Sequence, residues 1–102
     1  KNAPKKKEKI IIMGDLEANF QAAVERAREW DHPNLTNDHK LALYSLYKQA
    51  TAGDITTKRP GMFDLAGKAK WDAWKALEGL DQEEAKAKYI EELESQIETL
   101  SS

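Results

Sequence analysis

Apolar residues recur at three- and four-residue spacing in four segments, a pattern typical of amphipathic helices. The segments run from about Asp15 to Trp30, from about 37 to 52, from about Leu65 to Leu77 and from about Asp81 to Leu100. Two apolar stripes are clearest: Phe20, Ala23, Val24 and Ala27 in the first, and Ala85, Tyr89, Leu93, Ile97 and Leu100 in the last. Four short helices without a credible pair of strands predict an all-α bundle.

Residues with known preferences for helix ends mark the boundaries. Thr36 or Asn37 can cap the second helix, and Gly53 can end it because glycine adopts the backbone conformation common there. Asp81, followed three residues later by Glu84, is a good start for the fourth helix.

The remaining segments divide the chain into an extension and one domain. Residues 1–14 read as a basic extension or linker, and 15–102 as the domain. The connection over 53–64 is long for a compact bundle, and long ordered loops are often functional. We expect Met62 and Phe63 to pin this loop to the core.

Composition narrows the class of protein. The chain has 102 residues, enough for one small domain, with 40% apolar and 33% charged residues. It has no cysteine, which excludes disulfides, thiol catalysis and cysteine-bound zinc. The net charge of −2 argues against a general nucleic-acid binder, but residues 40–70 carry six basic and two acidic side chains. This basic centre indicates a local anion site or a chance cluster.

The second helix holds the first candidate site. Tyr44 and Lys48 are four residues apart and share one face, with Tyr47 on the adjacent strip. A tyrosine beside a lysine suits a phosphorylated ligand that carries a base, since the ring can stack and the ammonium can pair with phosphate. The alternative is a half-buried tyrosine and a solvated lysine, and the residues alone leave both open.

The third helix contributes "GKAKWDAW". Its tryptophans, Trp71 and Trp74, are predicted to anchor the core rather than to contact a ligand. Lys68 and Lys70 point different ways on a helix, so at most one of them should face a given site.

Signals for catalysis are weak. His32 and His39 flank a turn and match no metal-ligand pattern, and there is no phosphate-binding glycine loop or nucleophile elbow. We therefore expect a protein that is not an enzyme and has no metal or other cofactor.

The run "LYSLYKQATAGDITTKRPGMFDLAGKAKWDAWKAL", followed by "AKAKYIEEL", closely resembles the acyl-CoA-binding protein family over about Phe20 to Leu93. The resemblance implies an up-down-down-up four-helix bundle that binds medium- to long-chain acyl-CoA without catalysis. It also implies that Tyr44 and Lys48 contact the 3′-phosphate and nucleotide, that Tyr47 lies near the adenine, and that Lys70 binds the 3′-phosphate.

The same resemblance gives two further contacts and two departures. Tyr89 matches the tyrosine that closes over the nucleotide, and Arg28 falls where many members have a lysine near the head group. Ala66 replaces a lysine that borders the ligand in many members, and Lys40 stands where several have an apolar residue of the acyl groove. Both departures leave affinity and chain-length preference open.

The expected partner is acyl-CoA, with no nucleic acid and no transmembrane segment, in a cytoplasmic monomer that stores, transports and protects the ligand. Three alternatives stay open. The chain could be a helical protein-interaction module, or could contact membranes transiently through its basic extension. It could also be a module once fused to an acyl-CoA-processing enzyme.

Overall fold

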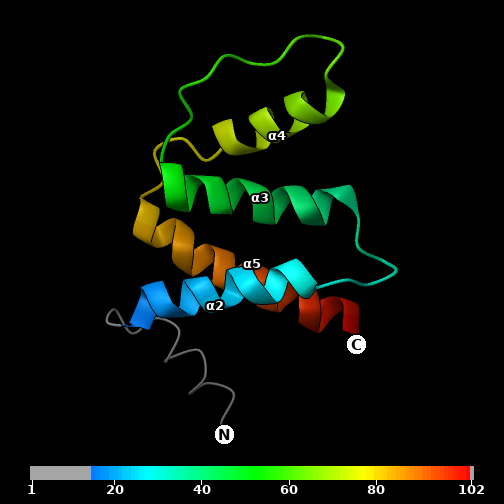
Figure 1. Cartoon of the computed structure of the whole chain (residues 1–102), viewed down its shortest axis with the longest axis vertical. Coiled ribbons are helices and arrows are strands. Elements are labelled where there is room, and N and C mark those ends of the chain that lie inside the picture. The colour runs from blue at the N-terminus through cyan, green and yellow to red at the C-terminus, as the bar shows by residue number, and fades with distance from the viewer. Residues whose placement is uncertain (1–14, 102) are drawn as a thin grey trace, which may run out of the picture.

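The structure, a computed structural model, describes residues 15–101, and every regular element in them is helical. The helices are α2 (Leu16–Glu29), α3 (Asn37–Ala52), α4 (Leu65–Lys75) and α5 (Gln82–Ser101). In Figure 1, α2 and α5 run one way across the molecule while α3 and α4 run the other. The up-down-down-up bundle is therefore confirmed, whereas the extension predicted over 1–14 lies outside the described residues.

The predicted caps define the helix ends. The hydroxyl of Thr36 accepts from the His39 N–H, while the His39 ring accepts from the Thr36 N–H, so that both donors at the start of α3 are satisfied. Gly53 ends α3 with a φ of 83°, a conformation that favours glycine. The carboxylate of Asp81 accepts from the N–H groups of Glu83 and Glu84 at the start of α5.

The core lies where α5 packs against both α2 and α3. Both predicted stripes face it, and Phe20 and Leu93 are each only 1% exposed. The buried apolar side chains from the three helices are Leu16, Phe20, Ala23, Val24, Leu46, Ala50, Ala85, Tyr89, Ile90 and Leu93.

Two buried glutamines, which the apolar pattern does not reveal, fix the ends of α3 against the rest of the bundle. At the C-terminal end, the side chain of Gln49 donates to the Leu80 carbonyl (2.8 Å) and to the carboxylate of Asp54 (2.9 Å). At the other end, the side chain of Gln96 donates to the His39 carbonyl (2.9 Å). These bonds join residues 31 and 57 positions apart, so they fix the register of α3 against the chain that follows it.

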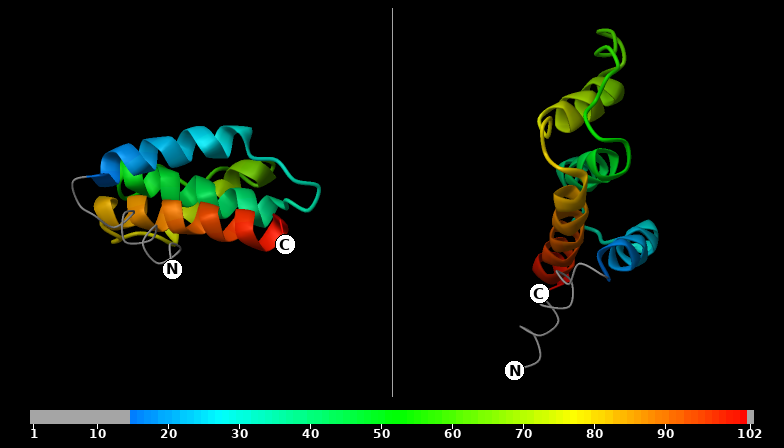
Figure 2. Two further views of the ribbon diagram at one scale, coloured as in Figure 1. Left: turned by 90° about the horizontal axis from the view of Figure 1, so that it is seen from below. Right: turned by 90° about the vertical axis from the view of Figure 1, so that its left-hand side faces the viewer.

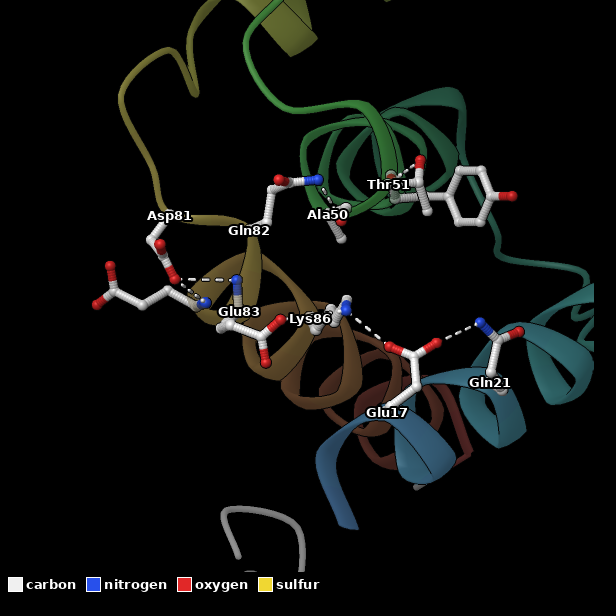
Figure 3. Close-up of polar contacts among 10 residues, drawn as sticks. Glu17, Gln21, Ala50, Thr51, Asp81, Gln82, Glu83 and Lys86 are labelled. Atoms are coloured by element: carbon white, nitrogen blue, oxygen red, sulfur yellow. Dashed lines mark hydrogen bonds and ion pairs between the residues drawn. The ribbon is translucent and has the colours of Figure 1, made fainter. Parts of the chain in front are cut away.

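An ion pair joins the start of α5 to α2. The ammonium of Lys86 lies 2.6 Å from one carboxylate oxygen of Glu17, and the other oxygen accepts from Gln21 at 2.8 Å (Figure 3). The bonds from Lys86 and then Gln21 lower the pKa of Glu17, and the bond to Glu17 raises the pKa of Lys86.

Helix α4 packs mainly on α3 and has no buried residue. Figure 2 shows it beyond α3, on the side away from α2 and α5. The loop over 53–64 is held to α4 by polar contacts: Arg59 makes two 2.9 Å bonds to the carboxylate of Asp72, and the indole N–H of Trp71 donates to the Thr57 carbonyl.

The expectation that Met62 and Phe63 pin this loop to the core is wrong. They are 70% and 94% exposed. Both occupy the corner of a turn that the Asp64 N–H closes by donating to the Gly61 carbonyl at 3.1 Å, and corner side chains point away from the chain. The polar contacts of Arg59 and Trp71, together with the buried side chain of Ile55, hold the loop instead.

Candidate ligand site between helices α3 and α4

Two interactions between a cation and an aromatic ring cross from α3 to α4. The Nζ atom of Lys70 lies 5.5 Å from the centre of the Tyr44 ring, and the Nζ atom of Lys48 lies 5.0 Å from the Trp74 ring. Residues 44 and 48 are four apart on α3, as are 70 and 74 on α4. Because the two helices run in the same direction, the two pairs lie one turn apart along a single shared face.

This arrangement brings together three of the predicted site residues: Tyr44, Lys48 and Lys70. It also places the ring of Trp74 under the ammonium of Lys48. The prediction that this side chain anchors the core is wrong, since α4 has no buried residue. Its indole N–H donates to the Gly53 carbonyl at 2.8 Å, which fixes the ring against the end of α3. The equal four-residue spacing on both helices is the signal that could have revealed it.

The two lysines lack the carboxylate partners that Lys75 and Arg59 have. Lys75 pairs with Glu78 and Arg59 with Asp72, whereas no ion pair to Lys48 or Lys70 is found within residues 15–101. Cation–π contact leaves the ammonium hydrogens able to bond an anion. The face between α3 and α4 thus presents two positive charges that are not neutralised locally.

Tyr47 lies on the adjacent strip of α3 and belongs to an aromatic group that includes residues of α2 and α5. Its ring stacks on that of Phe20 with centres 6.2 Å apart and lies 6.4 Å from that of Tyr89, and Phe20 and Tyr89 meet edge to face at 5.3 Å. Tyr47 is 36% exposed and Tyr89 only 4%, so Tyr47 is the phenol that a ligand can reach more easily.

Tyr89 and Arg28 interact through their electrostatics. Burial, and to a lesser degree the nearby Tyr47, raises the pKa of Tyr89, while the charge of Arg28 partly opposes that rise. The guanidinium of Arg28 is bonded to Glu25 at 3.1 Å on the exposed face of α2. Arg28 is thus close enough to influence Tyr89, but its charge is already shared with a carboxylate.

The two departures from the family pattern are both exposed. Ala66 lies in the first turn of α4 and Lys40 in the first turn of α3. Neither side chain is needed for the packing of the core, so each is free to alter a ligand contact.

Other kinds of site find less support in residues 15–101. No three His, Asp or Glu side chains converge there to hold a metal ion, and none of the helices has the length and apolar content for crossing a bilayer. A hollow of about 170 Å³ between α2 and α5, lined by Ala23, Arg26 and Ile90 among others, includes none of the predicted site residues.

The chain is similar to known proteins over most of its length. The family model described as acyl CoA binding protein matches residues 17–93. An acyl-CoA-binding protein of Ricinus communis is 52% identical over 74% of this chain and 82% of its own. Acyl-CoA-binding protein homolog 3 of Caenorhabditis elegans is 43% identical over 84% of this chain and 77% of its own.

Solved structures show the same likeness. The crystal structure of Oryza sativa acyl-CoA-binding protein 2 superimposes with a TM-score of 0.79 at 46% identity, covering 84% of this chain and 94% of that one. The protein from Moniliophthora perniciosa gives a TM-score of 0.77 at 43% identity, with 84% of each chain covered. The chain is a member of the acyl-CoA-binding protein family.

Proposed function

We propose that this chain binds medium- to long-chain acyl-CoA thioesters without breaking or forming a covalent bond. The observation that carries the proposal is a pair of lysines that form no ion pair within residues 15–101. Lys48 of α3 contacts a ring of α4, and Lys70 of α4 contacts a ring of α3. Family membership, and the names of the relatives, support the choice of ligand.

The polar end of the ligand would lie on this surface. Lys48 and Lys70 donate charge-assisted hydrogen bonds to phosphate, with the Tyr44 hydroxyl adding a third donor. The 3′-phosphate of CoA is assigned to Lys70. The half-exposed ring of Tyr47 lies on the adjacent strip of α3, where it can stack against the adenine. The buried ring of Tyr89 packs beside that of Tyr47, and the charge of Arg28 adds a weaker attraction for the anionic ligand.

The acyl chain supplies most of the affinity. Each buried methylene is worth about 0.8 kcal/mol, so a 16-carbon chain contributes on the order of 10 kcal/mol before ordering costs. Phosphate contacts then select CoA esters over free fatty acids, and apolar contacts select esters over bare CoA.

This activity is binding alone, in keeping with a role in storage, transport and protection of acyl-CoA by a cytoplasmic monomer. No cofactor enters the proposal.

Titration calorimetry with palmitoyl-CoA tests the proposal, with CoA and palmitate as separate controls. We expect one ligand per chain and affinity for the thioester at least a hundredfold above that for either half, because each half forfeits one set of contacts. Equal affinity for palmitate and palmitoyl-CoA would remove the lysine pair from the site. A folded chain that binds none of the three ligands would refute the proposal.

A further inference from the structure

Three large apolar side chains stand together in solvent at one edge of the molecule. Met62, Phe63 and Leu65 are 70%, 94% and 72% exposed, respectively. We call these three residues the apolar tip. Scattered exposed apolar residues are normal, but three in four consecutive positions, one of them almost wholly exposed, form a feature that needs a partner.

The backbone that carries the apolar tip is held in place. The Asp64 N–H closes the turn at Gly61, and the Asp64 carboxylate caps α4 by accepting from the Gly67 N–H at 2.9 Å. Upstream, the two bonds from Arg59 to Asp72 fix the loop against α4. The tip is therefore presented by a defined turn, and its exposure is a property of that conformation.

Basic residues lie close to the apolar tip in the sequence. Residues 55–70 contain four basic residues and a single acidic one, Asp64, whose carboxylate is occupied as the α4 cap. Lys58 is exposed and Lys68 is half-buried, and neither forms an ion pair within residues 15–101. Exposed apolar side chains near an unpaired lysine such as Lys58 match the surface of an anionic bilayer. The apolar side chains would enter the boundary of the acyl region, and the lysine would meet the anionic head groups.

We propose that the apolar tip is a docking point for anionic lipid membranes. The tip favours a membrane over a protein partner because of its shape. The loop lies at the outer edge of the molecule, beyond α4 (Figure 1). Met62 and Phe63 are the central residues of its turn, and Leu65 begins α4. A stable protein interface buries at least about 1,000 Å² in total, far more than such a turn offers, whereas a bilayer accepts a small protrusion. The docking needs no bound acyl-CoA and is independent of the proposed function.

Co-sedimentation with vesicles of phosphatidylcholine, with and without 30% phosphatidylserine, tests the proposal on the whole chain. Phe63→Asn should lower the partition coefficient for the anionic vesicles about tenfold, because one phenyl ring no longer leaves water. Lys58→Gln should lower it roughly fivefold, and Lys88→Gln, which removes an exposed charge from α5, should change it much less. The basic residues of 1–14 are common to all variants, so these differences report on the tip alone. Unchanged partition of Phe63→Asn would overturn the proposal.

A second measurement locates the contact directly. The chain has no cysteine, so Phe63→Cys carries a single thiol for an environment-sensitive fluorophore, with Thr99→Cys on exposed α5 as the matched control. Anionic vesicles should shift the emission to the blue at position 63 and not at 99. Vesicle binding without a shift at 63 would assign docking to another surface. Phe63→Asn should keep its affinity for palmitoyl-CoA. If that affinity fell as much as vesicle binding does, the tip would be part of the ligand site and the proposal would also be overturned.

Discussion

Replacing Lys70 with methionine separates its role in binding from any role in the fold. Methionine keeps the apolar stem that crosses toward α3 and removes the ammonium. In the free chain, Lys70 makes one cation–π contact with Tyr44 at 5.5 Å and no ion pair within residues 15–101. At an exposed position such a contact is worth about 0.5–1 kcal/mol, so unfolding in urea should change by no more than that.

The loss of affinity should be larger than the loss of stability. A hydrogen bond to a charged phosphate contributes about 1.5–3 kcal/mol, which corresponds to a roughly tenfold to 150-fold increase in Kd. Lys75→Met is the matched control, since Lys75 lies on the same helix but pairs with Glu78 at 2.9 Å. It should leave the Kd almost unchanged.

Titration with a ligand that lacks the 3′-phosphate identifies the contact. Palmitoyl-dephospho-CoA should bind the unmodified chain more weakly than palmitoyl-CoA does. Lys70→Met should bind both ligands about equally, because the partner of Lys70 is absent in one case and Lys70 itself in the other. The assignment of Lys70 to the 3′-phosphate would be refuted if Lys70→Met bound palmitoyl-CoA as tightly as the unmodified chain does. It would also be refuted if Lys70→Met weakened binding of the dephospho ligand as much as binding of palmitoyl-CoA.

Three further predictions address the scaffold. Phe20→Ala should reduce the free energy of unfolding by about 3–5 kcal/mol, measured in urea, because the ring is 1% exposed and packs on Tyr89; a loss below about 1 kcal/mol would contradict this packing. Asp72→Asn should speed tryptic cleavage of the 53–64 loop with little change in thermal midpoint, since the pair with Arg59 is half exposed; unchanged cleavage would show that other contacts hold the loop. Glu17→Gln should be less stable than the unmodified chain at pH 7. Because the folded pKa of Glu17 is lowered, this difference should vanish as the pH falls from about 4.3 through that lower value, and a difference that persists in acid would reject the ion pair as its cause.

The helices could be predicted from the sequence because their signals are local. Thr36, Gly53 and Asp81 act within one turn of chain, and the stripe around Phe20 needs only a fixed helical period. The buried Gln49 could not be predicted in this way. Its partners include Leu80, 31 residues away, and a polar residue in an apolar stripe carries no mark of a distant acceptor.

The site was predictable in part. The pairing of Tyr44 with Lys48 follows from helical spacing, but the position of Lys70 came from family resemblance, because the path of a twelve-residue loop is not encoded in a local period. The same gap explains the error at Phe63. An aromatic residue in a loop is commonly buried, and only the turn closed by Asp64 shows that this one points outward.

The most direct test of a ligand site between α3 and α4 is an NMR titration with palmitoyl-CoA that follows the three tryptophan indole N–H signals. Trp74 lies under Lys48 on the proposed surface, whereas Trp30 packs against the core beyond the end of α2. We expect the Trp74 signal to shift in proportion to bound ligand and the Trp30 signal to stay in place. The account would be contradicted if, at saturating ligand, the Trp30 signal shifted and the Trp74 signal did not.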